Sequence, residues 1–111
     1  MQAATSFAYN RRINQYLNND INQASPAQLI LKVYDFAILN CQKKNMIKTN
    51  EAIQVLINSL NFDLEGARDI SIGLFRLYQY CQEQTRKNNF EEAQKILTEL
   101  RDTWKQALTN R

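Results

Sequence analysis

The chain has 111 residues, a size that fits one domain with a single core. A hydrophobic share of 44% argues against a wholly disordered chain, and two Gly with one Pro are too few for the turns of a sheet-rich fold. The net charge of +3 is scattered, without the dense basic stripe of nucleic-acid-binding proteins. We therefore expect an all-helical protein and no nucleic-acid partner.

The sequence gives no sign of a membrane or secretory segment. No apolar run approaches the roughly 20 residues needed to cross a bilayer, and residues 1–5 lack the apolar core of a signal peptide. We expect a cytoplasmic protein with no direct membrane insertion. Cys41 and Cys81 lie far apart, and we expect two buried free thiols rather than a disulfide or a metal site.

Two helical patterns come first in the chain. Apolar side chains spaced three and four residues apart in residues 3–18 predict a short N-terminal helix or arm. Ser25 can cap the next helix, and Pro26 suits its first position because the missing N–H has no partner there. We expect this first long helix to run to about Lys44.

This first long helix is apolar around most of its circumference. Only a narrow polar strip interrupts it, formed by Gln28, Lys32, Asp35 and Gln42. Two interpretations stay open: the helix is the central and most buried one, or it carries apolar surface reserved for a partner.

Three further helices follow. A second long helix is expected from residue 46 or 49 to residue 62, a connection at residues 63–66, and a third helix at residues 67–87. Asn89 and Glu92 match a capping box that would start the fourth helix. The expected core stripes are Ala67, Ile70, Leu74, Leu77 and Cys81 on the third helix, and Phe90, Ala93, Leu97, Leu100, Trp104 and Ala107 on the fourth.

Short connections force neighbouring helices to run antiparallel. The prediction is therefore an all-α, antiparallel up-down-up-down four-helix bundle with a short N-terminal helix or arm. We expect a single domain over residues 1–111, with the arm at residues 1–22 and the bundle at residues 25–108.

Catalytic chemistry is not expected. The chain has no His, which removes the commonest general base and metal ligand. Neither Cys has an imidazole to activate it, and no Gly-rich phosphate loop is present. We expect no enzyme, no metal and no cofactor.

Four segments together resemble the flagellar secretion chaperone family, FliS. Residues 16–29 (YLNNDINQASPAQL) resemble the start of the family's sequence, with a Tyr followed by an Ala-Ser/Thr-Pro-x-x-Leu helix start. Residues 33–35 are similar to its Leu-Tyr-Asp, residues 77–80 to its Leu-Tyr-Asp-Tyr, and residues 100–107 to its closing segment with a Trp-Lys pair. The four matches occur in the family's order.

The resemblance implies an antiparallel four-helix bundle that binds the disordered C-terminal segment of flagellin in the cytosol. Such chaperones prevent premature polymerisation and help deliver flagellin to the export gate, a membrane protein of the flagellar type III secretion apparatus. Four positions depart from the family: Phe36 stands where Gly is common, Gln79 replaces Asp, and Cys81 and Gln84 replace the Met and basic residues that are usual just beyond it. These departures concern the client contacts rather than the fold.

Candidate partner-binding residues come from the resemblance and from the residues themselves. The resemblance assigns Tyr16 and Ile21 to an N-terminal segment that can cover the binding groove, with an ordinary packed arm as the alternative. Tyr34 and Tyr78 combine an apolar ring with a polar tip, which suits an interface, and a core position is the alternative. The remaining candidates, at the groove floor or off the main apolar stripes, are Phe36, Ile57, Leu64 and Phe75.

Two alternatives from other classes stay open on the sequence alone. The apolar first helix is compatible with a self-associating structural or adaptor bundle that has no flagellin client. The basic character of the chain is compatible with a small nucleic-acid-binding regulator, although its dispersed charges argue against that class.

Overall fold

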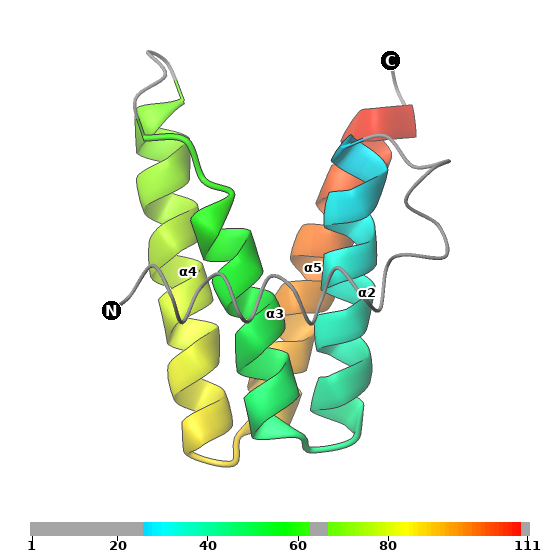
Figure 1. Cartoon of the computed structure of the whole chain (residues 1–111), viewed down its shortest axis with the longest axis vertical. Helices are drawn as coiled ribbons and strands as arrows, with labels where there is room; N and C mark the ends of the chain where they lie inside the picture. The colour runs from blue at the N-terminus through cyan, green and yellow to red at the C-terminus, as the bar shows by residue number, and fades with distance from the viewer. Residues whose placement is uncertain (1–25, 63–66, 110–111) are drawn as a thin grey trace.

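The computed structural model describes residues 26–62 and 67–109, which form four α-helices (Figure 1). No strand occurs within these two ranges. The predicted N-terminal helix or arm and the candidates Tyr16, Ile21 and Leu64 lie outside the described residues. The helices are α2 (Pro26–Gln42), α3 (Met46–Asn58), α4 (Arg68–Arg86) and α5 (Phe90–Thr109).

Each helix packs against two of the others. Helix α2 contacts α3 and α5, and α4 contacts the same two helices from the opposite corner. Successive helices run in opposite directions (Figure 1). The predicted antiparallel up-down-up-down four-helix bundle is therefore confirmed.

Two tight turns close one end of the bundle. The turn between α2 and α3 places Lys44 in the left-handed region, at φ 55°, and the turn between α4 and α5 places Asn88 there, at φ 62°. Asn tolerates this conformation better than most residues. Asn45 then caps α3, because its side-chain oxygen accepts a hydrogen bond from the Lys48 N–H at 3.0 Å.

The start of α5 differs from the prediction. Asn89 donates through Nδ2 to Oε1 of Gln84 at 2.8 Å. The Glu92 carboxylate accepts a hydrogen bond from the Tyr80 hydroxyl at 3.0 Å. The predicted Asn89–Glu92 capping box is wrong, because both side chains are engaged with α4 instead.

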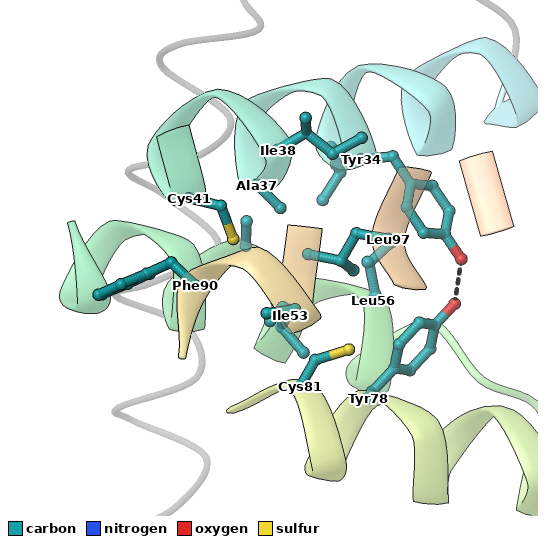
Figure 2. Close-up of a cluster of buried hydrophobic side chains, with 13 residues drawn as sticks. Tyr34, Ala37, Ile38, Cys41, Ile53, Leu56, Tyr78, Cys81, Phe90 and Leu97 are labelled. Atoms are coloured by element: carbon teal, nitrogen blue, oxygen red, sulfur yellow. Dashed lines mark hydrogen bonds between the residues drawn. The ribbon is translucent and has the colours of Figure 1, made fainter. Parts of the chain in front are cut away.

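The buried core lies in the half of the bundle next to the two turns. All four helices contribute, and Figure 2 shows the side chains converging between them. Cys41 and Cys81 are buried free thiols, as predicted. The core residues are Val33, Tyr34, Ala37, Ile38, Cys41, Ala52, Ile53, Leu56, Tyr78, Cys81, Phe90, Ala93 and Leu97.

Helix α2 buries most of its apolar circumference between its two neighbours. Most of its apolar side chains are either buried or half-buried. Leu39 is an exposed exception. The structure therefore favours the interpretation that α2 is a central, buried helix. None of the described helices is long and apolar enough to pass through a bilayer.

The predicted stripe of α4 is only partly buried: Cys81 is in the core and Leu74 packs against it, but two other members are exposed. Ile70 is 65% exposed and Leu77 is 39% exposed, whereas Ser71, Gln82 and Thr85 are buried. The apolar pattern failed here because buried positions on α4 are occupied by hydrogen-bonded polar side chains.

These polar side chains join α4 to α3. The Thr85 hydroxyl donates to Oδ1 of Asn50 at 2.8 Å. Gln82 donates through Nε2 to the Asn50 carbonyl at 3.3 Å, and Asn50 returns a bond from Nδ2 to the Gln82 carbonyl at 3.4 Å. A buried polar contact of this kind is tolerated because its donors find acceptors.

The different burial of two leucines tests this assignment. Leu97→Ala should lower the free energy of unfolding by about 2–5 kcal/mol, because a fully buried side chain leaves a cavity. Leu77→Ala should cost less than about 1.5 kcal/mol, because that side chain already contacts water. Urea denaturation measures both values, and equal losses would contradict the exposed position of Leu77.

Candidate partner-binding cleft

An apolar cleft opens at the end of the bundle opposite the two turns. Its volume is about 380 Å³. Figure 1 shows α3 and α4 leaning away from α2 and α5 toward this end. The walls come from the start of α2, the end of α3 with the residues after it, the start of α4 and the end of α5. The lining residues are Ala27, Ile30, Leu56, Ser59, Leu60, Asn61, Ala67, Ile70, Ser71, Leu74, Tyr78 and Trp104.

The stripe of α5 runs out of the core and into this cleft. Phe90, Ala93 and Leu97 are buried as predicted. Farther along the same face, Leu100 is half-buried and Trp104 is 39% exposed. The expectation that Trp104 is a core residue is therefore wrong, because the neighbouring helices have diverged at its level and its indole forms part of a wall.

An ion pair fixes this exposed half of α5 to α2. Arg101 Nη1 lies 3.1 Å from Oδ1 of Asp35, and its Nη2 lies 3.0 Å from Oδ1 of Asp102. These carboxylates raise the pKa of Arg101. An exposed pair contributes little stability, but this one tethers α5 three residues before Trp104.

Tyr78 forms part of the cleft floor and meets Tyr34, which is buried behind it. Their hydroxyls are hydrogen-bonded to each other, and their ring centroids are 6.4 Å apart with the planes inclined by 54°. Figure 2 shows the two hydroxyls pointing toward one another from α2 and α4 at the edge of the core. Both residues are buried, and Tyr78 also lines the cleft. The pair therefore connects two diagonally opposed helices.

Burial keeps this floor uncharged. It is the largest cause that raises the pKa of Tyr34, and the hydrogen bond with Tyr78 and the indole of Trp104 only partly oppose it. Burial also raises the pKa of Tyr78, and the neighbouring Tyr34 adds to the effect. Both hydroxyls are therefore neutral at physiological pH.

Reactive groups are not gathered at the cleft. Burial raises the pKa of the Cys81 thiol to about 12, and the charges of Cys41 and Glu92 add to the effect. Such a thiol is unreactive, because the thiolate is the nucleophile. Residues 26–62 and 67–109 contain no cluster of three His, Cys, Asp or Glu suited to a metal ion.

The structure brings only part of the predicted site together. Tyr78 lines the cleft and Tyr34 is buried behind it, but Phe36, Ile57 and Phe75 do not line the cleft. Phe36 and Ile57 are half-buried against the core. Phe75 packs edge-to-face on Phe62, with ring centroids 6.1 Å apart and planes at 83°. Contact of these three side chains with a partner stays a prediction.

Sequence reasoning missed two of the main cleft residues. Ile70 and Trp104 lie on regular apolar stripes, and both were assigned to the core. A stripe gives the direction of a side chain on its own helix, but not whether a neighbouring helix reaches that level. One signal could have found them: the apolar stripes of α4 and α5 extend to the helix ends that lie farthest from the two tight turns, where the helices are free to diverge.

The described residues define a four-helix bundle with an apolar cleft at its open end. A family model described as flagellar protein FliS matches residues 9–111, and the chain belongs to this FliS family. It is also 27% identical over 110 aligned residues to the flagellar secretion chaperone FliS of Bacillus subtilis (strain 168), with 84% of this chain and 83% of the relative covered. No solved structure matches the chain. These findings place it among the chaperones of flagellum biogenesis.

The raised pKa values of the tyrosine pair predict a loss of stability at alkaline pH. The unfolded chain ionises its tyrosines above about pH 10, while the folded protein holds Tyr34 and Tyr78 neutral. Stability from the pair is therefore complete below that pH and is lost as the pH rises further. We expect the free energy of unfolding of Tyr34→Phe/Tyr78→Phe to fall less steeply than that of the unaltered protein between about pH 9 and 11. Parallel curves in urea denaturation would contradict this.

Proposed function

We propose that this chain is a cytosolic export chaperone that binds the disordered C-terminal segment of flagellin. In this role it prevents premature polymerisation and assists delivery to the flagellar type III export apparatus. Membership in the FliS family supports the proposal. The observation that carries it is the apolar cleft at the open end of the bundle, with Ile70 and Trp104 exposed on its walls.

The physical chemistry of the cleft suits a segment of this kind. An amphipathic segment that is disordered when free can fold as a helix and place its apolar face in a groove. Ordering the segment costs free energy, so a large contact surface need not produce extreme affinity. Moderate affinity suits a chaperone, because it has to release its client at the export apparatus.

The proposed contacts extend beyond the cleft. A wrapped client of several short helices needs more surface than a cavity of about 380 Å³ offers. The proposed additional contacts are Tyr16, Ile21, Phe36, Ile57, Leu64 and Phe75. The second proposed partner is the export-gate membrane protein, which would receive the chaperone with its client. Membership in a chaperone family gives no reason to expect an enzyme.

A matched pair of isoleucine variants tests the cleft. Ile70 is 65% exposed in the first turn of α4 at the cleft, and Ile47 is 63% exposed in the first turn of α3 at the far end of the bundle. Glutamate at either position is favoured by the helix dipole. Ile70→Glu should weaken binding of a flagellin C-terminal peptide at least about 10-fold, because it places a charge against the apolar face of the client. Ile47→Glu should leave binding unchanged.

Isothermal titration calorimetry measures these affinities, with the peptide taken from a flagellin encoded in the same genome. We expect a Kd of about 1 μM or tighter for the unaltered chain, and a gain of peptide helicity by circular dichroism. An absence of binding by the unaltered chain would overturn the proposed function. If sedimentation then showed concentration-dependent self-association, the alternative of a structural or adaptor bundle would be favoured.

A further inference from the structure

The hydroxyl pair at the cleft has one hydrogen that the bond between its two oxygens does not use. Tyr34 and Tyr78 share one hydrogen bond, in which either oxygen can be the donor. Whichever hydroxyl donates, the accepting hydroxyl keeps its own hydrogen. Among residues 26–62 and 67–109, neither tyrosine oxygen has another hydrogen-bonded oxygen to receive that hydrogen. A buried donor needs an acceptor, so an occupant that excludes water from the cleft has to accept this hydrogen or leave it unpaired.

The other hydroxyls of the cleft are already engaged. Ser59 donates to the Leu56 carbonyl at 2.7 Å, and Ser71 donates to the Asn61 carbonyl at 2.9 Å. Because Tyr78 lines the cleft, an occupant meets the spare hydrogen of the tyrosine pair beneath the apolar walls when Tyr34 is the donor within the pair, and it also meets the side chain of Asn61.

The cleft also restricts what kind of acceptor can complete the floor. None of its described lining residues is charged. A carboxylate would therefore be buried without a cation, which is costly. A carbonyl in the middle of a client helix is already bonded within that helix. A neutral side chain, either an amide or a hydroxyl, remains as the suitable acceptor.

We propose that the Tyr34–Tyr78 pair is a specificity determinant that selects a client segment with one neutral polar side chain, an amide or a hydroxyl, on its otherwise apolar face. This inference rests on the proposed function, because it describes the client of the same cleft. An occupant with a wholly apolar face would cover the spare hydrogen and leave it unpaired. The pair thus discriminates against purely apolar segments, which an apolar cleft alone would accept.

The test combines variants of the chaperone with variants of the peptide. In the protein, Tyr34→Phe/Tyr78→Phe removes both hydroxyls and keeps the ring shapes, a change that is nearly neutral for stability when both partners are replaced. In the flagellin C-terminal peptide, each Asn, Gln, Ser and Thr is replaced singly by Ala. Calorimetry gives the affinity of every combination, and coupling between the two sets of changes is read as in a double-mutant cycle.

We expect one peptide position to stand out. Its change to Ala should weaken binding to the unaltered protein by about 3- to 10-fold and have little effect on binding to the double variant. The double variant itself should bind the unaltered peptide more weakly by a similar factor. Binding of an apolar fluorescent dye should be the same for both proteins, because the walls are unchanged.

The outcomes separate this inference from the function on which it rests. If the unaltered chaperone does not bind the peptide, the proposed function fails. If it binds but no Ala replacement weakens binding, the inference is overturned while the function stands, and this result needs no protein variant to fold. If the double variant binds all peptides as tightly as the unaltered protein does, the inference is likewise overturned.

Discussion

The structure depends on a core that fills only one half of the bundle. Two tight turns hold the helices together at one end, and the fully buried side chains lie next to those turns. Beyond the Tyr34–Tyr78 pair the same helices continue without a shared core, and the cleft occupies the space between them. The buried core and the apolar cleft thus lie toward opposite ends of the same four helices.

Two polar contacts of α4, one with α3 and one with α2, help to hold the helices in this arrangement. On the α3 side, buried Gln82 and Thr85 are held by Asn50, so that side is fixed by directional bonds as well as by apolar contact. Across the bundle, the tyrosine pair joins the diagonally opposed helices α2 and α4 at the level where the core ends. Directional contacts favour one register of the helices, whereas apolar contacts alone tolerate several arrangements.

The sequence was sufficient for the fold and only partly sufficient for the site. Helix ends were marked by local chemistry, such as Pro26 at the start of α2 and the turn residues near Asn88, and local chemistry does not depend on the rest of the molecule. The buried face of α4 could not be derived in this way, because Ser71 and Thr85 look like surface residues until their partners are known. The level at which the helices diverge is a property of the whole bundle, which is why Trp104 was assigned to the core.

A bundle that is complete at one end can bind without folding on its client. Of the buried core residues only Leu56 and Tyr78 line the cleft, and the wall residues Ile30, Leu60 and Leu74 pack against the core as half-buried side chains. Filling or emptying the cleft therefore leaves most of the stabilising contacts unchanged. In the proposed role, the chaperone would not draw on client binding for its own folding. Its affinity would then reflect the match between the cleft and the client alone.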